Sequence, residues 1–246
     1  PPVPSLLMKA LKVVKPTTML TVPLIIEKVY KGSVLPTIKK SRTLTWMNTH
    51  MNGLMCRIIG MKLKKTFGGC LTFYGIGGAK LDPEVEAFLL KAKFPYAIGY
   101  GLTETSPLLG YAMHGWRGVG VMGYPVYNVK LKLHNVNPET GEGEIVAKGP
   151  NVMLGYYNNP EATAEVFDKD GFFHTGDYGK LDEEGWIYIT GRKKNLIILS
   201  NGKNVYPEEI EADLQKVEGV TEVVVYAGES RVQKDKITIV AEIFPD

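Results

Sequence analysis

The sequence has few cysteines, and their number excludes a disulfide framework. Cys56 and Cys70 can form one bridge at most, and neither has further ligands at the spacing of a zinc site. A chain so poor in cysteine fits a reducing compartment, so we expect a cytoplasmic protein.

Long apolar runs are also missing. No stretch approaches the ~20 consecutive apolar residues that cross a bilayer, and the opening Pro1-Pro2-Val3-Pro4 does not resemble a signal peptide. We expect residue 1 to be an internal position of a longer protein. With 246 residues, of which 44% are hydrophobic, the chain can bury the core of an ordinary globular protein.

Acidic residues are scarce in the first quarter of the chain. Residues 1–65 contain twelve Lys and Arg but a single acid, Glu27, whereas the remainder has a surplus of acids. Such asymmetry can mark a face that meets anionic lipid or the phosphates of a coenzyme, so weak peripheral contact with a membrane is one interpretation. Lysines that solvate helix faces are the other interpretation, and we favour it.

Local patterns in the first half predict alternating helices and strands. Apolar residues at helical spacing over 5–14 predict a helix, and the apolar run 17–22 predicts a strand. A second predicted strand, 71–74, runs into a glycine loop at 75–81, and Asp82-Pro83-Glu84 supplies the cap, proline and acid of a helix start. A strand, a glycine loop and a helix form a ligand-binding switch in open α/β sheets.

The stretch Gly99-Tyr100-Gly101-Leu102-Thr103-Glu104 combines an aromatic ring, glycines, a hydroxyl and a carboxylate. An aromatic face can stack on a base, and glycines let phosphates approach the backbone. Thr103 could donate to a phosphate oxygen, and Glu104 could hold magnesium, which prefers oxygen ligands. A Gly-rich turn with an N-cap threonine explains the same six residues, and both interpretations stay open at this point.

Two patterns argue against other ligands. Gly118, Gly120 and Gly123 spell G-x-G-x-x-G, but Tyr124-Pro125 and a predicted strand follow, whereas a dinucleotide-binding loop opens into a helix. The Lys/Arg-rich run 192–203 contains four consecutive apolar residues, which favours a buried strand over a nucleic-acid patch. We expect no nucleic-acid partner.

Several later motifs complete a larger pattern. They are Gly143-Glu144-Ile145, Thr175-Gly176-Asp177, Gly191-Arg192-Lys193-Lys194 and the run from Gly202 to Glu211. In this order and spacing, and together with residues 99–104, they resemble the acyl-adenylate-forming superfamily of acyl-CoA synthetases, luciferases and adenylation domains. Within it the chain looks most like a long-chain fatty acid CoA ligase, over nearly its whole length.

The resemblance implies the roles of individual residues. Asp177 would accept hydrogen bonds from both ribose hydroxyls, Lys194 would be the hinge of a mobile domain, and Gly202 would lie in a loop beside the coenzyme A channel. Thr103, Glu104 and Arg192 would have catalytic roles, with Glu104 as the metal ligand. The implied nucleotide-binding set is Gly77, Gly78, Ala79, Gly99, Tyr100, Gly101, Thr103, Asp177 and Arg192. Without the resemblance, tight turns would explain the glycines and Asp177 equally well.

The implied fold is the α/β C-terminal part of a large AMP-binding domain, residues 1–191, with a small β-barrel-like subdomain. A small α+β domain, residues 192–246, would follow it, incomplete. The cofactors and substrates implied are ATP or AMP, magnesium, coenzyme A and a fatty acid; the oligomeric state is open.

The implied function is ATP-dependent formation of acyl-AMP and then of an acyl-CoA thioester. The family's Ser/Thr/Gly-rich phosphate loop and its C-terminal lysine are missing from these residues, so we expect the piece alone to be inactive. Two alternatives stay open: an adenylate-forming enzyme for another acid or for an acyl carrier protein acceptor, and a noncatalytic nucleotide- or acyl-binding module.

Overall fold

The computed structural model divides the chain into two compact units. The first is Pro1–Val129 with Pro150–Met153 and Gly185–Ile187, and the second is Lys130–Gly149, Leu154–Glu184 and Tyr188–Asp246. The residues described are 4–41, 43, 46–47, 50–199, 204–217, 219–229 and 237–245.

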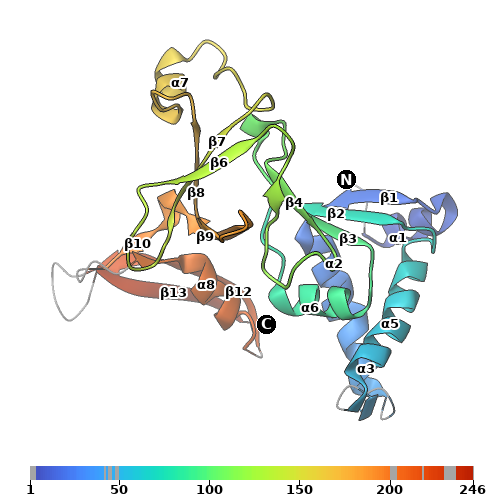
Figure 1. The fold of residues 1–246 in the computed structure, drawn as a ribbon. Helices are drawn as coiled ribbons and strands as arrows, with labels where there is room; N and C mark the ends of the chain where they lie inside the picture. Colours follow the sequence, from blue (N-terminus) through green and yellow to red (C-terminus); the bar gives the residue numbers. More distant parts are fainter. Residues whose placement is uncertain are drawn as a thin grey trace. The chain divides into compact units, whose positions relative to one another are not determined.

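A mixed five-stranded sheet forms the centre of the first unit (Figure 1). Three parallel strands, β1 (Thr18–Thr21), β2 (Phe73–Gly77) and β3 (Tyr96–Tyr100), are followed by the antiparallel β4 (Gly110–Met113) and β5 (Tyr124–Pro125). Gly77 pairs with Gly99 in the β2–β3 register. The loops after these two parallel strands therefore leave the sheet at the same edge.

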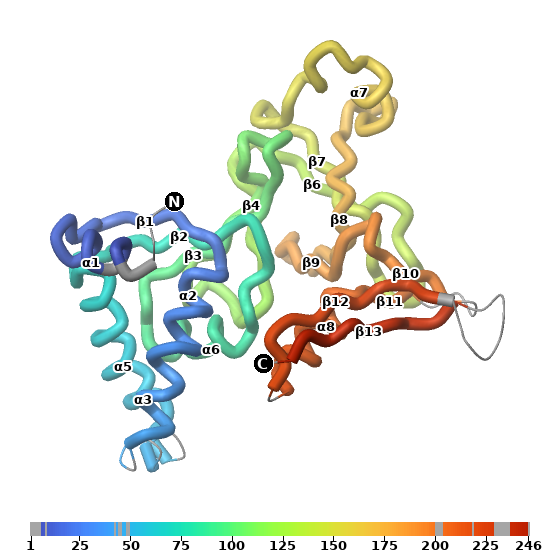
Figure 2. Tube along the Cα trace, turned by 180° about the vertical axis from the view of Figure 1, so that it is seen from behind, coloured from blue at the N-terminus to red at the C-terminus, as the bar shows by residue number. Residues whose placement is uncertain are grey.

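Helices of the first unit pack on the face of the sheet that carries Tyr74. The Tyr74 ring lies 5.3 Å from Phe67, at the end of α5, and 5.4 Å from Phe94. Helix α5 also contacts α1 and α6 (Figure 2). The helices are α1 (Pro4–Val14), α2 (Pro23–Val29), α3 (Leu35–Lys40), α5 (Asn52–Thr66) and α6 (Pro83–Lys91), with a π-helical turn Tyr30–Val34.

Three local predictions for this unit are confirmed. α1 covers the helix predicted over 5–14, and β1 covers most of the strand predicted over 17–22. The Asp82 carboxylate caps α6, because it accepts hydrogen bonds from the backbone N–H groups of Glu84 (2.8 Å) and Val85 (3.4 Å). Within the described part of the chain, every helix is too short or too polar to cross a membrane.

The second unit is built on a four-stranded sheet with the order β6-β7-β8-β9. Its strands are β6 (Lys130–His134), β7 (Gly143–Lys148), β8 (Phe173–Leu181) and β9 (Ile187–Arg192), and α7 (Pro160–Val166) lies in the connection between β7 and β8. β6 and β9 form the two edges, so over the described residues this sheet is open. The expectation of a barrel-like subdomain is wrong here, because β6 and β9 do not pair with each other.

The C-terminal segment of the second unit adds two hairpin-like pairs and a helix. β10 (Ile197–Ile198) pairs with β11 (Asn204–Val205), and β12 (Val220–Glu229) pairs with β13 (Ile237–Pro245). α8 (Pro207–Leu214) packs on β12 (Figures 1 and 2). This α+β segment follows position 192; the boundary between 191 and 192 as a domain border stays a prediction.

Candidate functional site

The loop after β3 is shaped by the side chain of Thr105. Its hydroxyl accepts a hydrogen bond from the backbone N–H of Leu102 (2.9 Å) and lies 3.1 Å from the carbonyl oxygen of Pro107. The chain forms a 3₁₀ turn, Thr103–Thr105, between these contacts. Gly101 is required in this loop, because a Cβ atom there would collide with the Pro107 carbonyl oxygen. As a result Thr103 is exposed and Glu104 is half-buried.

A segment distant in the sequence braces this turn. Asn151 Nδ2 donates to the carbonyl oxygens of Thr105 (2.9 Å) and Leu108 (2.7 Å). The backbone N–H of Met153 donates to the carbonyl oxygen of Glu104 (2.8 Å). No sequence pattern predicts these contacts, since a single Asn after a Gly-Pro pair is typical of any loop.

The Gly77-Gly78-Ala79 loop lies at the same edge of the sheet as the stretch from Gly99 to Glu104. Gly77 ends β2 opposite Gly99, and Gly78 has a positive φ of +87°, which favours glycine. Gly78 and Ala79 are exposed. The predicted nucleotide-binding residues of the first unit thus gather at the carboxyl ends of two parallel strands, where open α/β sheets bind their ligands.

Tyr100 is more enclosed than its predicted role suggests. Its side chain is only 5% exposed, and it shares a face of β3 with Tyr96 and Ile98, which are also buried. Stacking of this ring on a base stays a prediction.

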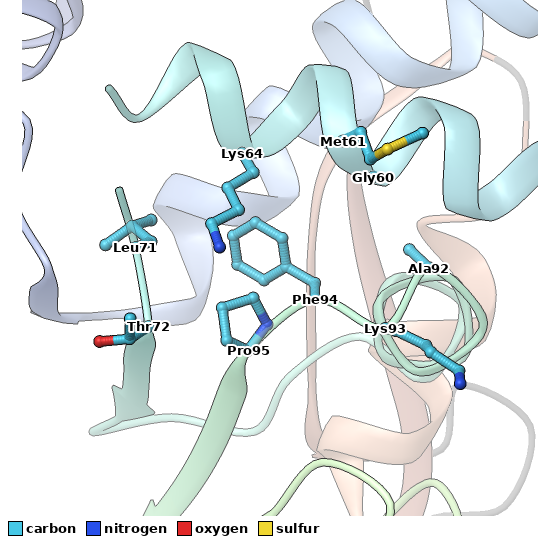
Figure 3. Close-up of a pocket in the computed structure, with 9 residues that line it drawn as sticks. All are labelled: Gly60, Met61, Lys64, Leu71, Thr72, Ala92, Lys93, Phe94 and Pro95. Atoms are coloured by element: carbon cyan, nitrogen blue, oxygen red, sulfur yellow. The ribbon is translucent and has the colours of Figure 1, made fainter. Parts of the chain in front are cut away.

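A hollow of about 300 Å³ lies at the opposite end of the parallel strands (Figure 3). Lys64 and Met61 of α5 line it, together with Thr72 and with Phe94 and Pro95. Thr72 directly precedes β2 and Pro95 directly precedes β3. Because the hollow opens at the amino ends of these strands, it is separate from the candidate nucleotide loops.

In the second unit, a bulge in β8 presents Asp177. Glu144 pairs with Tyr178 and Val146 pairs with His174, so one residue of β7 faces three residues of β8, 175–177. The Thr175 hydroxyl stabilises the bulge: it donates to the carbonyl oxygen of Ile145 (2.7 Å) and accepts from the backbone N–H of Asp177 (3.1 Å). Bulges re-aim side chains and are frequent beside active sites.

Asp177 forms an ion pair with Arg192 at the end of β9. Arg192 Nε lies 2.9 Å from Asp177 Oδ1. The Asp177 side chain is 5% exposed, whereas the Arg192 side chain is 48% exposed. The bulge therefore holds the backbone of Asp177, and the carboxylate is paired with a cation that solvent can reach.

The remaining predicted residues have less structural context. Lys194 is exposed in a 3₁₀ turn, Lys193–Asn195, directly after β9. Gly202 lies outside the described residues. Among the described residues, no three His, Cys, Asp or Glu side chains cluster as a metal site, and Glu104 as a metal ligand stays a prediction. The Gly118–Gly123 loop leads into β5, as predicted.

Comparison with known proteins identifies the family. The fold is that of adenylate-forming enzymes: the structure of ATP-bound MatB from Rhodopseudomonas palustris is 28% identical, and superposes with a TM-score of 0.71 over 99% of this chain and 43% of that one. The family model described as AMP-binding enzyme matches residues 1–157. The chain therefore belongs to the AMP-binding enzymes, and the predicted family is confirmed.

Two relatives differ in how much of the chain they match. Long-chain-fatty-acid–CoA ligase 1 of Homo sapiens is 34% identical over 260 residues, which cover 98% of this chain and 36% of that protein. Probable 4-coumarate–CoA ligase 2 of Dictyostelium discoideum is 47% identical over 146 residues, 55% of this chain and 26% of that protein. The chain spans less than half the length of each of these relatives.

Proposed function

We propose that the chain is part of an ATP-dependent acyl-CoA ligase that activates a long-chain fatty acid. The observation that carries the proposal is the buried carboxylate of Asp177 beside the exposed guanidinium of Arg192. A carboxylate offers two acceptor oxygens, which suit the two hydroxyls of a ribose, and a guanidinium suits phosphate. This donor and acceptor set fits a nucleotide better than a structural turn, which needs no cation that solvent can reach.

The proposed reaction has two steps. A carboxylate oxygen of the fatty acid attacks the α-phosphorus of ATP, forming acyl-AMP as pyrophosphate leaves. The sulfur of coenzyme A then attacks the acyl carbon, its proton passes to solvent, and AMP leaves. Lys194 would be the point about which the C-terminal segment turns between the steps, and Gly202 would approach the coenzyme A channel.

The residues after β3 fit a magnesium ion that arrives with the nucleotide. Magnesium is usually held by one or two carboxylates, with phosphate oxygens and water as its other ligands. Glu104 would supply that carboxylate, and the exposed Thr103 hydroxyl would donate to a phosphate oxygen. When bound, the ion would stabilise negative charge on the phosphates.

The choice of a fatty acid rests on two observations. Relatives that act on long-chain fatty acids match almost the whole chain, as the human ligase does. In addition, beyond Phe73 one face of β2 and β3 carries small residues, where Gly75 pairs with Ala97 and Gly77 with Gly99. Leu20, 80% exposed, lies over Gly75 on that face, so an apolar chain could lie along it.

An aromatic acid is the second candidate, favoured by the higher identity to the 4-coumarate–CoA ligase. Calorimetric titration with sulfamoyl adenosines that carry a dodecanoyl or a coumaroyl group separates the two. We expect tighter binding of the dodecanoyl analogue; tighter binding of the coumaroyl analogue would select the second candidate.

Asp177→Ala tests the nucleotide site itself. Two hydrogen bonds to a charged acceptor are lost, so we expect affinity for either analogue to fall about 100-fold or more. Glu183→Ala, which removes an exposed carboxylate in the hairpin after β8, should leave affinity unchanged. Failure of the folded wild-type chain to bind either analogue would contradict the proposed function.

A further inference from the structure

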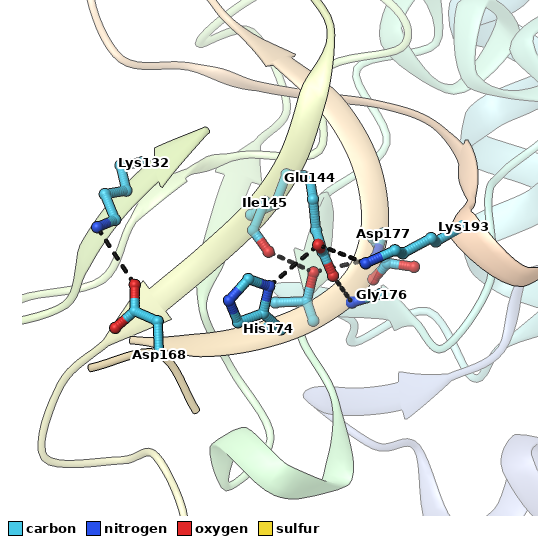
Figure 4. A network of polar contacts seen from close by, with 9 residues as sticks. Lys132, Glu144, Ile145, Asp168, His174, Gly176, Asp177 and Lys193 are labelled. Carbon is cyan, nitrogen blue, oxygen red and sulfur yellow. Dashed lines mark hydrogen bonds and ion pairs between the residues drawn. The ribbon is translucent and has the colours of Figure 1, made fainter. Parts of the chain in front are cut away.

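The buried carboxylate of Glu144 on β7 lies at the centre of a cluster of polar groups (Figure 4). The Glu144 side chain is 3% exposed. The carboxylate accepts hydrogen bonds from His174 Nδ1 (3.0 Å), Lys193 Nζ (2.9 Å) and the backbone N–H of Gly176 (3.3 Å). One side chain therefore connects β7, the bulge of β8 and the turn after β9.

The bulge explains why a carboxylate is needed at this position. Gly176 has a positive φ of +71° and lies in the part of β8 that is out of register with β7. Its N–H group is aimed at Glu144 rather than at a ladder carbonyl. A half-buried N–H without an acceptor would cost stability, so the carboxylate of Glu144 replaces the missing ladder bond.

The charge of Glu144 is matched inside the cluster. Burial alone would raise the pKa of this carboxyl, but the hydrogen bonds and electrostatic interactions with Lys193 and His174 together outweigh burial and lower the pKa. The group is therefore an anion at neutral pH, and charge-assisted bonds of this kind are the stronger ones.

The residues that Glu144 contacts are sequence neighbours of Asp177 and of its partner Arg192. Gly176 directly precedes Asp177, and Lys193 directly follows Arg192. Two neighbouring cations thus pair with two carboxylates from adjacent strands, Lys193 with Glu144 and Arg192 with Asp177. We therefore expect a change in the first pair to reach the backbone that carries the second.

We propose that Glu144 is a positioning residue for nucleotide binding, which holds Asp177 and Arg192 in the arrangement that a ribose and phosphate require. The inference rests on the proposed function of the Asp177–Arg192 pair. Glu144 would not touch the nucleotide; it would act through Gly176 and Lys193.

The test measures whether Glu144 acts through Asp177. Glu144→Gln is prepared in the wild-type and in the Asp177→Asn background, and the dodecanoyl sulfamoyl adenosine is the probe. We expect about tenfold weaker binding in the wild-type background and less than about twofold further loss beside Asp177→Asn, since coupled residues are not additive. Glu139→Gln, an exposed carboxylate shortly before β7, is the matched control.

Hydrogen exchange supplies a readout that needs no ligand. Glu144→Gln should speed exchange of the Gly176 amide, whereas Glu139→Gln should not. Lys193→Met, which changes a side chain that is 54% exposed, should also weaken binding. If Glu144→Gln does not fold, Lys193→Met is compared in the wild-type and Asp177→Asn backgrounds instead.

The outcomes separate the inference from the proposed function. Equal losses in both backgrounds would mean that Glu144 only stabilises the fold, and would overturn the inference. If the wild-type chain binds the dodecanoyl analogue and Glu144→Gln binds it equally well, the inference is overturned and the proposed function stays intact. A wild-type chain that does not bind would overturn both.

Discussion

Replacing Asn151 by alanine should loosen the loop after β3 without disturbing the sheet. The change removes two hydrogen bonds, to the carbonyl oxygens of Thr105 and Leu108. Each is worth about 0.5–1.5 kcal/mol net, and the bond to Leu108 is exposed to solvent, which can replace it. Asn151 Oδ1 is buried without a hydrogen-bond partner among the described residues, so its removal recovers part of the loss. We therefore expect the free energy of unfolding to fall by about 1 kcal/mol.

The assay for this prediction is urea unfolding with hydrogen exchange of residues 101–109. Exchange at Leu109, whose N–H donates to the carbonyl oxygen of Tyr100, should speed in Asn151→Ala. Asn151→Asp should be more destabilised above pH 5, because a carboxylate would face the two carbonyl oxygens in place of the amide donors. Gln215→Ala removes an exposed amide from the other unit and is the control. An Asn151→Ala protein with wild-type urea midpoint and wild-type exchange would refute the bracing role.

Two further predictions concern stability. Gly101→Ala should lower the free energy of unfolding by about 1–3 kcal/mol, because the added Cβ would collide with the Pro107 carbonyl. Gly118→Ala is the control: its added Cβ meets nothing within 4 Å, so the variant should be neutral in the same urea assay. Burial raises the pKa of Glu86, whose carboxylate accepts a hydrogen bond from the Gly120 N–H (2.9 Å). Because this pKa is higher in the folded than in the unfolded protein, the free energy of unfolding falls as the pH rises above the pKa of the unfolded state. Glu86→Gln should therefore resist more urea than wild type at pH 8, and this gain should disappear at pH 4; a gain that persists at pH 4 would contradict this cause.

Elements with local signals were predictable from the sequence. The start of α6 is one, since the groups that Asp82 caps lie two and three residues away. The family motifs likewise placed Gly77 and Gly99 at one site, and the β2–β3 register brings them together. The order of the motifs predicts this proximity because neighbouring parallel strands end at the same edge of a sheet.

Features that depend on distant partners were not predictable. The bulge before Asp177 exists because of the register between β7 and β8, whose paired residues lie some thirty positions apart. The burial of Tyr100 depends on which face of β3 the helices cover, and alternation along a short apolar strand does not identify that face. The bonds of Asn151 join segments more than forty residues apart.

In the loop after β3 and in the bulge of β8, a threonine side chain bonds backbone groups that lie outside the regular hydrogen-bond pattern. Thr105 accepts from Leu102 beside Glu104, and Thr175 bonds β7 and the Asp177 N–H within the bulge. In each loop a polar side chain from elsewhere, Asn151 or Glu144, completes the bonding. A turn needs glycine and threonine for its backbone, and a nucleotide site needs them for close approach and hydrogen bonds. The same residues therefore satisfy both needs, which is why the short motifs alone could not distinguish a turn from a site. Asn151 and Glu144 add support from a second segment, which is what we expect where an acid is held for a ligand.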